Sequence, residues 1–158
     1  DGTDRRDKEA DVNPRTKADR AAGIFAEGFS CSQAVFLAFA EDLGLERETA
    51  LKISQAFGGG MAHLGEACGA ASGAFMALAL KHGRTRADDL AARDRTYDRM
   101  QRLAARFREA HRALRCPDLL GLDLATEAGL AEAKARDLFQ TRCALYVRTA
   151  AELVEELL

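Results

Sequence analysis

The sequence is poor both in residues that break helices and in residues that favour strands. It contains two prolines, two tyrosines and no tryptophan among 158 residues, whereas alanine, leucine, arginine and glutamate recur throughout. Because the β-branched and aromatic residues typical of strands are scarce, the composition favours helix. We therefore expect an all-α protein, a single-domain bundle of about six or seven helices with one long helix.

Long apolar runs and an excess of one charge are also absent. A membrane-spanning helix needs roughly 18 apolar residues, and the longest apolar stretch, residues 68–80, is interrupted by Gly69, Ser72 and Gly73. The 23 basic residues are interspersed with 25 acidic ones, which indicates no surface for nucleic acid. We expect a soluble, cytoplasmic protein without a membrane span or a nucleic-acid partner. An exported form stays open because the chain begins at Asp1 without an initiator methionine.

The first residues differ from the rest in composition. Residues 1–13, DGTDRRDKEADVN, are almost wholly polar or charged. Such a segment buries too little apolar surface to offset the entropy lost on ordering. We predict a mobile charged tail over residues 1–15, followed by one helical domain over residues 16–158.

Apolar periodicity and capping signals divide this domain into helices. We expect helices over about residues 16–27, 30–43, 46–57, 67–80, 85–114 and 126–136, and a last helix from about residue 141 to the C-terminus. Ser30 and Gln33 form a capping box at the start of the second of these helices. The helix after Cys68 is apolar on every face, so we expect it at the centre of the bundle. Residues 58–65 and 117–124 are interpreted as loops.

The long helix over residues 85–114 is expected to bury one face of apolar side chains. Those expected on the buried side are Leu90, Tyr97, Met100, Ala104, Phe107 and Leu114. The helix is more extended than a bundle of this size requires, which makes a homodimer a reasonable expectation.

Four cysteines, Cys31, Cys68, Cys116 and Cys143, are more than core filling requires in a domain of this size. Three of them are predicted in the first turn of a helix, and Cys116 precedes Pro117 at a helix end. Unpaired amides at helix starts favour a thiolate, the form that binds metals and attacks electrophiles. Glycines around Cys68 would also let backbone amides approach a bound anion or cluster sulfur. We predict that the four cysteines converge on one redox-active or metal-binding site.

The spacing of these cysteines narrows the chemistry. No C-x-x-C pair is present, which argues against a thioredoxin-type dithiol and the usual paired zinc-finger ligands, and no C-x-x-C-H is present for covalent haem. The leading interpretation is an iron–sulfur cluster used in electron transfer. One alternative is a thiol/disulfide oxidoreductase with a low-pKa thiolate at Cys31 or Cys68. The other is a structural or sensory module that binds zinc.

The sequence leaves open whether the chain is an enzyme, and it identifies no catalytic residue. His63 lies five residues before Cys68 and could serve as a further ligand or proton donor. A loop histidine is more often simply solvated, and we adopt that interpretation for His63.

The residues around the cysteines resemble those of a known family. The C-G-A-x-x-G motif at Cys68 to Gly73, with one cysteine before it and two after it, is similar to the C_GCAxxG_C_C family of redox-active proteins. The FGGGM stretch from Phe57 and the RCPDLLGLDL stretch from Arg115 also match, and the resemblance extends over about residues 21–157. It implies an all-helical prokaryotic module with a redox role, but it supplies no reaction.

A similar cysteine module is associated with split-Soret cytochromes. That resemblance implies an iron–sulfur centre with Cys31, Cys68, Cys116 and Cys143 as its ligands. The haem-binding part of those cytochromes has no counterpart here, so electron transfer would require a separate redox partner protein.

Overall fold

The computed structural model describes residues 16–158, and the predicted tail over residues 1–15 lies outside the described residues. The described chain is helical, with an isolated bridge between Ala67 and Arg115 and no strand. Its elements are α1 (Lys17–Ala26), α2 (Cys31–Ala40), α3 (Arg47–Ser54), a 3₁₀ turn (Gln55–Phe57), α4 (Gly58–Ala62), α5 (Gly69–His82), α6 (Leu90–His111), α7 (Cys116–Leu120), α8 (Glu127–Ala135) and α9 (Leu138–Leu157). The all-α bundle is confirmed, but the described residues form more helices than expected, and two of them are long: α6 has 22 residues and α9 has 20. Over the same residues, no helix combines the length and apolar character that crossing a membrane requires.

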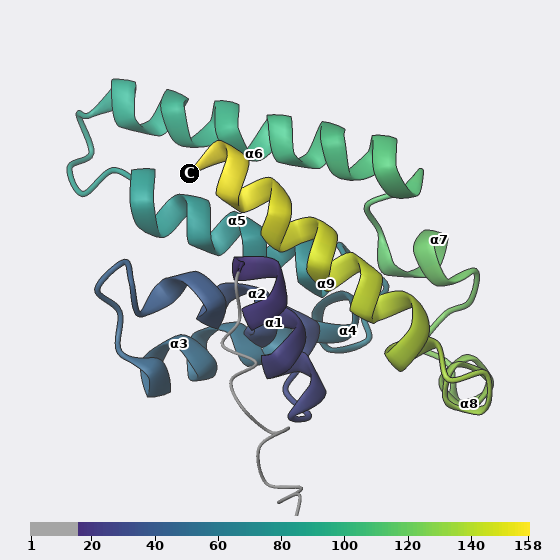
Figure 1. The fold of residues 1–158 in the computed structure, drawn as a ribbon. Helices are drawn as coiled ribbons and strands as arrows, with labels where there is room; N and C mark the ends of the chain where they lie inside the picture. Colours follow the sequence, from purple (N-terminus) through teal and green to yellow (C-terminus); the bar gives the residue numbers. More distant parts are fainter. Residues whose placement is uncertain (1–15) are drawn as a thin grey trace, which may run out of the picture.

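Helix α5 is the central element, as its apolar sequence predicts. It packs against α2, α6 and α9, while α1 packs against α2 and α9 (Figure 1). The buried residues of α5 are glycine, alanine, serine and one leucine. A Cβ atom at Gly73 would lie only 2.6 Å from the carbonyl oxygen of Ser32, so the small residues allow α2 to approach closely.

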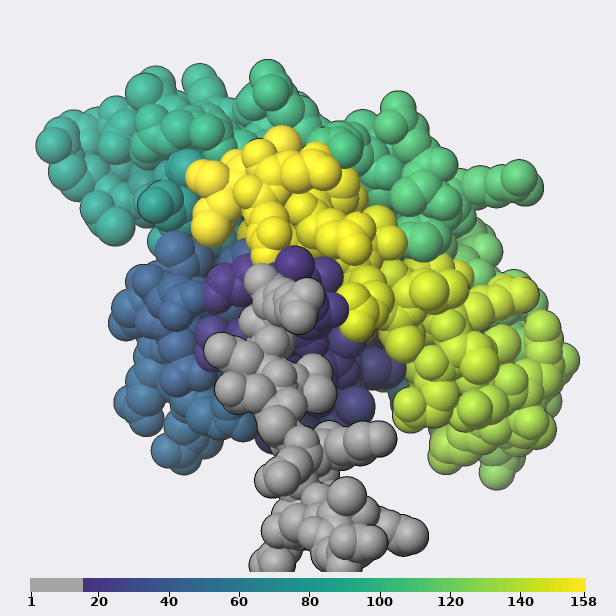
Figure 2. Space-filling model, viewed as in Figure 1, coloured from purple at the N-terminus to yellow at the C-terminus, as the bar shows by residue number. Residues whose placement is uncertain are grey.

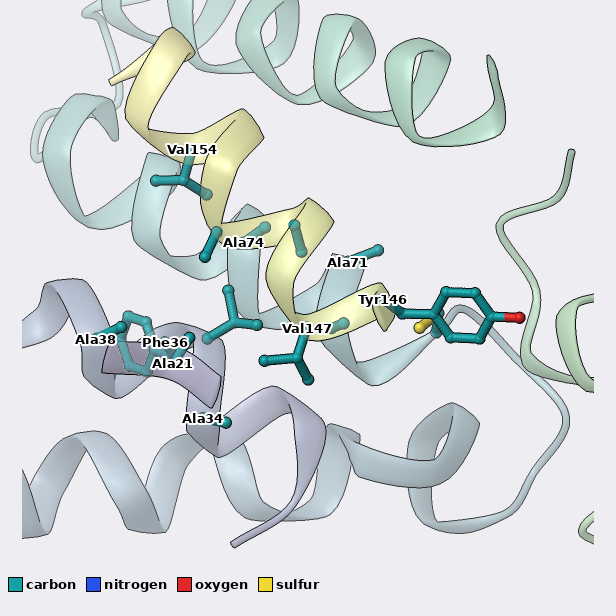
Figure 3. Close-up of a cluster of buried hydrophobic side chains, with 14 of the residues drawn as sticks. Ala21, Ala34, Phe36, Ala38, Ala71, Ala74, Tyr146, Val147 and Val154 are labelled. Atoms are coloured by element: carbon teal, nitrogen blue, oxygen red, sulfur yellow. The ribbon is translucent and has the colours of Figure 1, made fainter. Parts of the chain in front are cut away.

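The core is formed where these helices meet. Ala21 of α1, Phe36 of α2, Ala74 of α5 and Val147 of α9 belong to one buried cluster (Figure 3). Burial of each valine, leucine or phenylalanine in such a cluster contributes about 1.5–3 kcal/mol. In the space-filling view, α9 crosses the molecule between α1 and α6 (Figure 2).

The predicted capping box at the start of α2 is present. The Ser30 hydroxyl accepts from the Gln33 amide at 3.3 Å, and the Gln33 side-chain oxygen accepts from the Ser30 amide at 3.0 Å. The Ser32 hydroxyl donates to the Ser54 carbonyl at 2.6 Å, and the Gln33 amide group donates to the Leu51 carbonyl at 3.0 Å. These bonds attach the first turn of α2 to α3 and thereby fix the direction of Cys31.

Several helix boundaries differ from the prediction. Helix α2 ends at Ala40 and α6 at His111, and residues 58–62 form the short element α4 rather than a loop. Helix α6 begins five residues late, because the Asp89 carboxylate accepts from the Ala92 amide at 3.0 Å and caps the helix there. Residues 116–120 form α7 rather than a loop, since Pro117 in a first turn removes an amide that would have no partner. Helix α9 begins at Leu138, after Asp137 in the left-handed conformation, so Cys143 lies in its second turn and not its first.

The predicted buried face of the long helix is partly wrong. Phe107 is buried as expected, but Leu90, Tyr97 and Met100 are 51%, 56% and 41% exposed. The side of α6 that packs against α5 and α9 carries Phe107 together with Leu103, which was not among the residues expected to be buried. The error arises because a long helix with apolar residues on two adjacent stripes can bury only the stripe that its neighbours reach.

Candidate four-cysteine site

The structure brings all four cysteines to the wall of one cavity of about 230 Å³. Cys31 is the first residue of α2, Cys68 caps the start of α5, Cys116 is the first residue of α7, and Cys143 lies in the second turn of α9. All four are free thiols, and Cys68 and Cys116 are buried, whereas Cys31 and Cys143 keep partial contact with solvent. The apolar part of the wall is formed by Leu119, Leu120, Leu124, Phe139 and Tyr146.

Cys68 and Cys116 are held together by paired backbone hydrogen bonds. The Cys68 amide donates to the Leu114 carbonyl at 2.8 Å, and the Cys116 amide donates to the Glu66 carbonyl at 2.8 Å. This is the isolated antiparallel bridge between Ala67 and Arg115. Two cysteines separated by 48 positions are therefore fixed to each other through the main chain.

A left-handed turn beside this bridge forms another part of the cavity wall. Gly59, Gly60, Met61, Ala62 and His63 have φ values of 66°, 71°, 63°, 52° and 66°. The turn is closed by the His63 amide, which donates to the Gly59 carbonyl at 3.1 Å, and by the Glu66 amide, which donates to the Gly60 carbonyl at 3.0 Å. Each non-glycine residue in this conformation costs about 1–2 kcal/mol, so the surrounding contacts must over-determine it.

Two glycines make room for cysteine side chains. A Cβ atom at Gly60 would lie 2.7 Å from the Cβ atom of Cys116, and one at Gly69 would lie 2.4 Å from the Sγ atom of Cys31. Neither distance is compatible with a real side chain. The glycines near Cys68 therefore allow the close approach predicted for them.

Burial controls the protonation of the thiols. It raises the pKa of Cys116 to about 11 and that of Cys143 to about 12, and the nearby Cys31 thiol adds to both shifts. Burial also raises the pKa of Cys31 and of Cys68, although the amides of Gly59 and Ser32 act against the shift at Cys31, and those of Ala71 and Ala70 act against it at Cys68. The expectation of a low-pKa thiolate at Cys31 or Cys68 is therefore wrong for the metal-free protein, because desolvation outweighs the helix-start amides.

Helix α9 holds α7 in place beside the cavity. The Tyr146 hydroxyl donates to the Leu119 carbonyl at 3.1 Å, and the Arg142 guanidinium donates to the carbonyls of Leu119 and Leu120 at 3.3 and 3.5 Å. The Tyr146 ring lies at one end of the core cluster (Figure 3). Arg142 and Tyr146 flank Cys143 on α9, so these bonds fix Cys143 relative to α7 and its first residue, Cys116. No local sequence pattern marks Arg142 or Tyr146 for this role.

His63 borders the cavity, but its ring lies over Gly59, where an added Cβ atom would meet ring atom Cδ2 at 2.6 Å. The other histidines take part in contacts elsewhere: His82 Nε2 lies 3.0 Å from the Leu158 carbonyl, and His111 Nε2 lies 2.9 Å from the Thr149 hydroxyl. Across residues 16–158, no group of three or more His, Cys, Asp or Glu side chains is arranged to hold a single metal ion.

Fold and site together define an all-helical protein in which four separate helices each place one cysteine on a common cavity. The chain belongs to the C_GCAxxG_C_C family, because the model of that family, described as "Putative redox-active protein (C_GCAxxG_C_C)", matches residues 29–157. Comparisons with curated proteins and with solved structures find no match.

Proposed function

We propose that the four cysteines bind an iron–sulfur cluster that transfers single electrons. The observation that carries this proposal is the common cavity of about 230 Å³ lined by four thiols from four helices. For comparison, an engineered apolar cavity of roughly 150 Å³ accommodates benzene. The space between the thiols is therefore large enough for a compact inorganic group.

The donor set fits a cluster better than it fits one ion. Tetrahedral zinc holds each thiolate sulfur at about 2.3 Å, which brings the four sulfurs close together. The ligands of structural zinc usually come from close sequence pairs, whereas these four cysteines come from four separate segments. A cluster places several metal and sulfide atoms between its ligands, so its thiolates stand further apart, and four cysteines are the usual ligands of such clusters.

The residues around the cavity would support a bound anionic group. Ligation requires each thiol to lose its proton, and the raised pKa values of Cys116 and Cys143 mean that binding itself must drive this loss. The amides of Gly59 and Ala70, which favour the anionic form of Cys31, would offset part of the buried negative charge. The leucines and Phe139 of the wall limit access of water. When bound, a cluster supplies a one-electron couple whose potential depends on these amides and on exposure.

The exposure of the cysteine residues, as distinct from their desolvated thiol groups, indicates where a redox partner protein would approach. Cys68 and Cys116 are buried, but Cys31 and Cys143 retain contact with solvent. Electrons would therefore enter and leave on the side of α2 and α9 that carries these two residues. Residues 16–158 contain no second cysteine site to relay the electrons, so a redox partner outside these residues would exchange electrons with the cluster.

Protein purified without air tests this proposal. We expect iron, acid-labile sulfide and visible absorption, all lost in Cys68→Ser and all kept in the control Ser72→Ala, which changes a buried hydroxyl one turn further along α5. A colourless metal-free protein whose thiol count changes by two with reductant would contradict the cluster and support a thiol/disulfide oxidoreductase. One zinc per chain without colour would contradict it in favour of a structural or sensory metal module.

A further inference from the structure

An apolar groove on the outer side of α6 is uncovered. It has a volume of about 430 Å³ and is lined by Phe75 of α5 and Leu114 together with Tyr97, Met100, Gln101, Ala104 and Arg108 of α6. Tyr97 and Met100 are 56% and 41% exposed. Single exposed apolar residues are common, but a groove with this lining is typical of a binding surface.

The exposed apolar residues follow a helical repeat. Leu90, Tyr97 and Ala104 are spaced seven residues apart, which places them on one stripe of α6. Leu90 is 51% exposed, so the stripe is uncovered near the start of the helix as well as at the groove. A stripe of this length fits a partner helix that lies along α6 more readily than it fits a small ligand.

When two copies of α6 lie antiparallel, acidic residues of one copy come to lie opposite basic residues of the other. Asp94 and Arg108 each lie seven residues from Gln101, and Arg93 and Glu109 each lie eight residues from it. In an antiparallel pair of α6 helices centred on Gln101, Asp94 therefore faces Arg108 of the other copy, and Glu109 faces Arg93. Like charges at these positions would have opposed such a pair. The third acidic residue, Asp98, pairs with Arg102 of its own helix.

The side-chain volumes are complementary in the same arrangement. Tyr97 lies four residues before Gln101, and Ala105 lies four residues after it, so each tyrosine faces a small residue of the other helix. Ala104, the neighbour of Ala105, is part of the groove. A large residue opposite a small one lets two helices approach closely.

We propose that this surface binds the same surface of a second copy of the chain, as an antiparallel pair of α6 helices related by a two-fold axis at Gln101. The interface is isologous, so one patch supplies both sides of the contact. It does not depend on what the cysteines bind. It does adjoin the cysteine site, because Leu114 lines the groove and its carbonyl accepts the amide of Cys68.

Sedimentation equilibrium of the full chain under reducing conditions tests the surface. The chain has a mass of 17.1 kDa, and we expect a dimer at about 100 µM, a concentration at which weak but specific pairs form. Tyr97→Glu should give a monomer. The matched control is Leu145→Glu on α9, since Leu145 is 58% exposed and lies outside the groove. A monomeric wild-type chain, or a dimer that Leu145→Glu disrupts and Tyr97→Glu does not, would overturn the proposal.

Charge reversal tests the register. Asp94→Arg should weaken the dimer about tenfold, because it places two arginines opposite each other at both ends of the interface. Combining Asp94→Arg with Arg108→Asp should restore most of the affinity, since the pair is then reversed and not broken. If the double variant is weaker than Asp94→Arg alone, the antiparallel register centred on Gln101 is wrong.

Discussion

Helices α5 and α6 follow each other in the chain but differ in almost every physical respect. Eight residues are buried among the 14 of α5, whereas three are buried among the 22 of α6. Helix α5 carries small uncharged residues over most of its length, so three other helices approach it closely. Helix α6 is rich in arginine and contacts its neighbours along one side. The comparison shows that side-chain size and charge, and not helix length, decide which helix becomes central.

The largest expected difference between the two helices is the stability lost when one leucine in each is replaced by alanine. Leu78 of α5 is fully buried, and Leu90 of α6 is 51% exposed. Leu78→Ala should lower the free energy of unfolding by about 3 kcal/mol, because it leaves a cavity in the core. Leu90→Ala should change it by less than about 0.5 kcal/mol. Denaturant unfolding of dilute samples measures both, and equal losses would contradict the difference between the helices.

A smaller effect is expected at the glycines. Gly69→Ala forces a methyl group against Cys31 Sγ, so we expect the free energy of unfolding to fall by about 1–3 kcal/mol and the proposed cluster to be lost. Gly23→Ala in α1 is the control, since no atom lies within 4 Å of the added Cβ. It should stabilise the protein by about 0.5 kcal/mol, because alanine favours helix over glycine. If both variants bind the proposed cluster as the wild-type chain does, the close approach of α5 to Cys31 has no role in the site.

The last prediction concerns the proton on the Cys143 thiol of α9, which lines the same cavity as Cys68 at the start of α5. The ordinary thiol pKa is 9.0, and burial raises that of Cys143 to about 12 in the metal-free protein. The folded state therefore keeps a proton that the unfolded state loses above pH 9, so the free energy of unfolding should fall as the pH rises from about 9 to 12.

Alkylation of the reduced, metal-free protein gives a direct measurement. The rate at Cys143 should rise with pH through pH 10 without a plateau, because only the thiolate reacts. The same residue in denaturant should reach its plateau near its ordinary pKa. A plateau below pH 9 in the folded protein would show that burial does not control the protonation of Cys143.

Much of the helical pattern could be predicted from the sequence. The capping box at Ser30 and the apolar segment after Cys68 identified α2 and the central helix, because caps and periodicity are local properties. The start of α9 was missed because nothing local marks Asp137 as left-handed. The exposed side of α6 was missed because an apolar stripe is buried only where a neighbouring helix packs on it. The sequence does not indicate which stripe of α6 its neighbours cover.

At the site, the residue types were predictable and the arrangement was not. The number and spacing of the cysteines, without any C-x-x-C pair, required a site assembled from distant segments. The glycine run predicted a close backbone approach, but not the left-handed turn that continues through Met61, Ala62 and His63. Arg142 and Tyr146 became visible as supports of α7 only once α9 was in place.

The sequence by itself determined the all-helical class, the central position of α5 and the four thiols available for chemistry, because these follow from composition, local periodicity and residue identity. Only the tertiary structure decided that Cys68 and Cys116 are joined through the main chain, that the thiols are protonated in the absence of metal, and that one side of α6 is left uncovered. Each of these depends on distances and desolvation created by segments far apart in the chain, which local sequence does not encode.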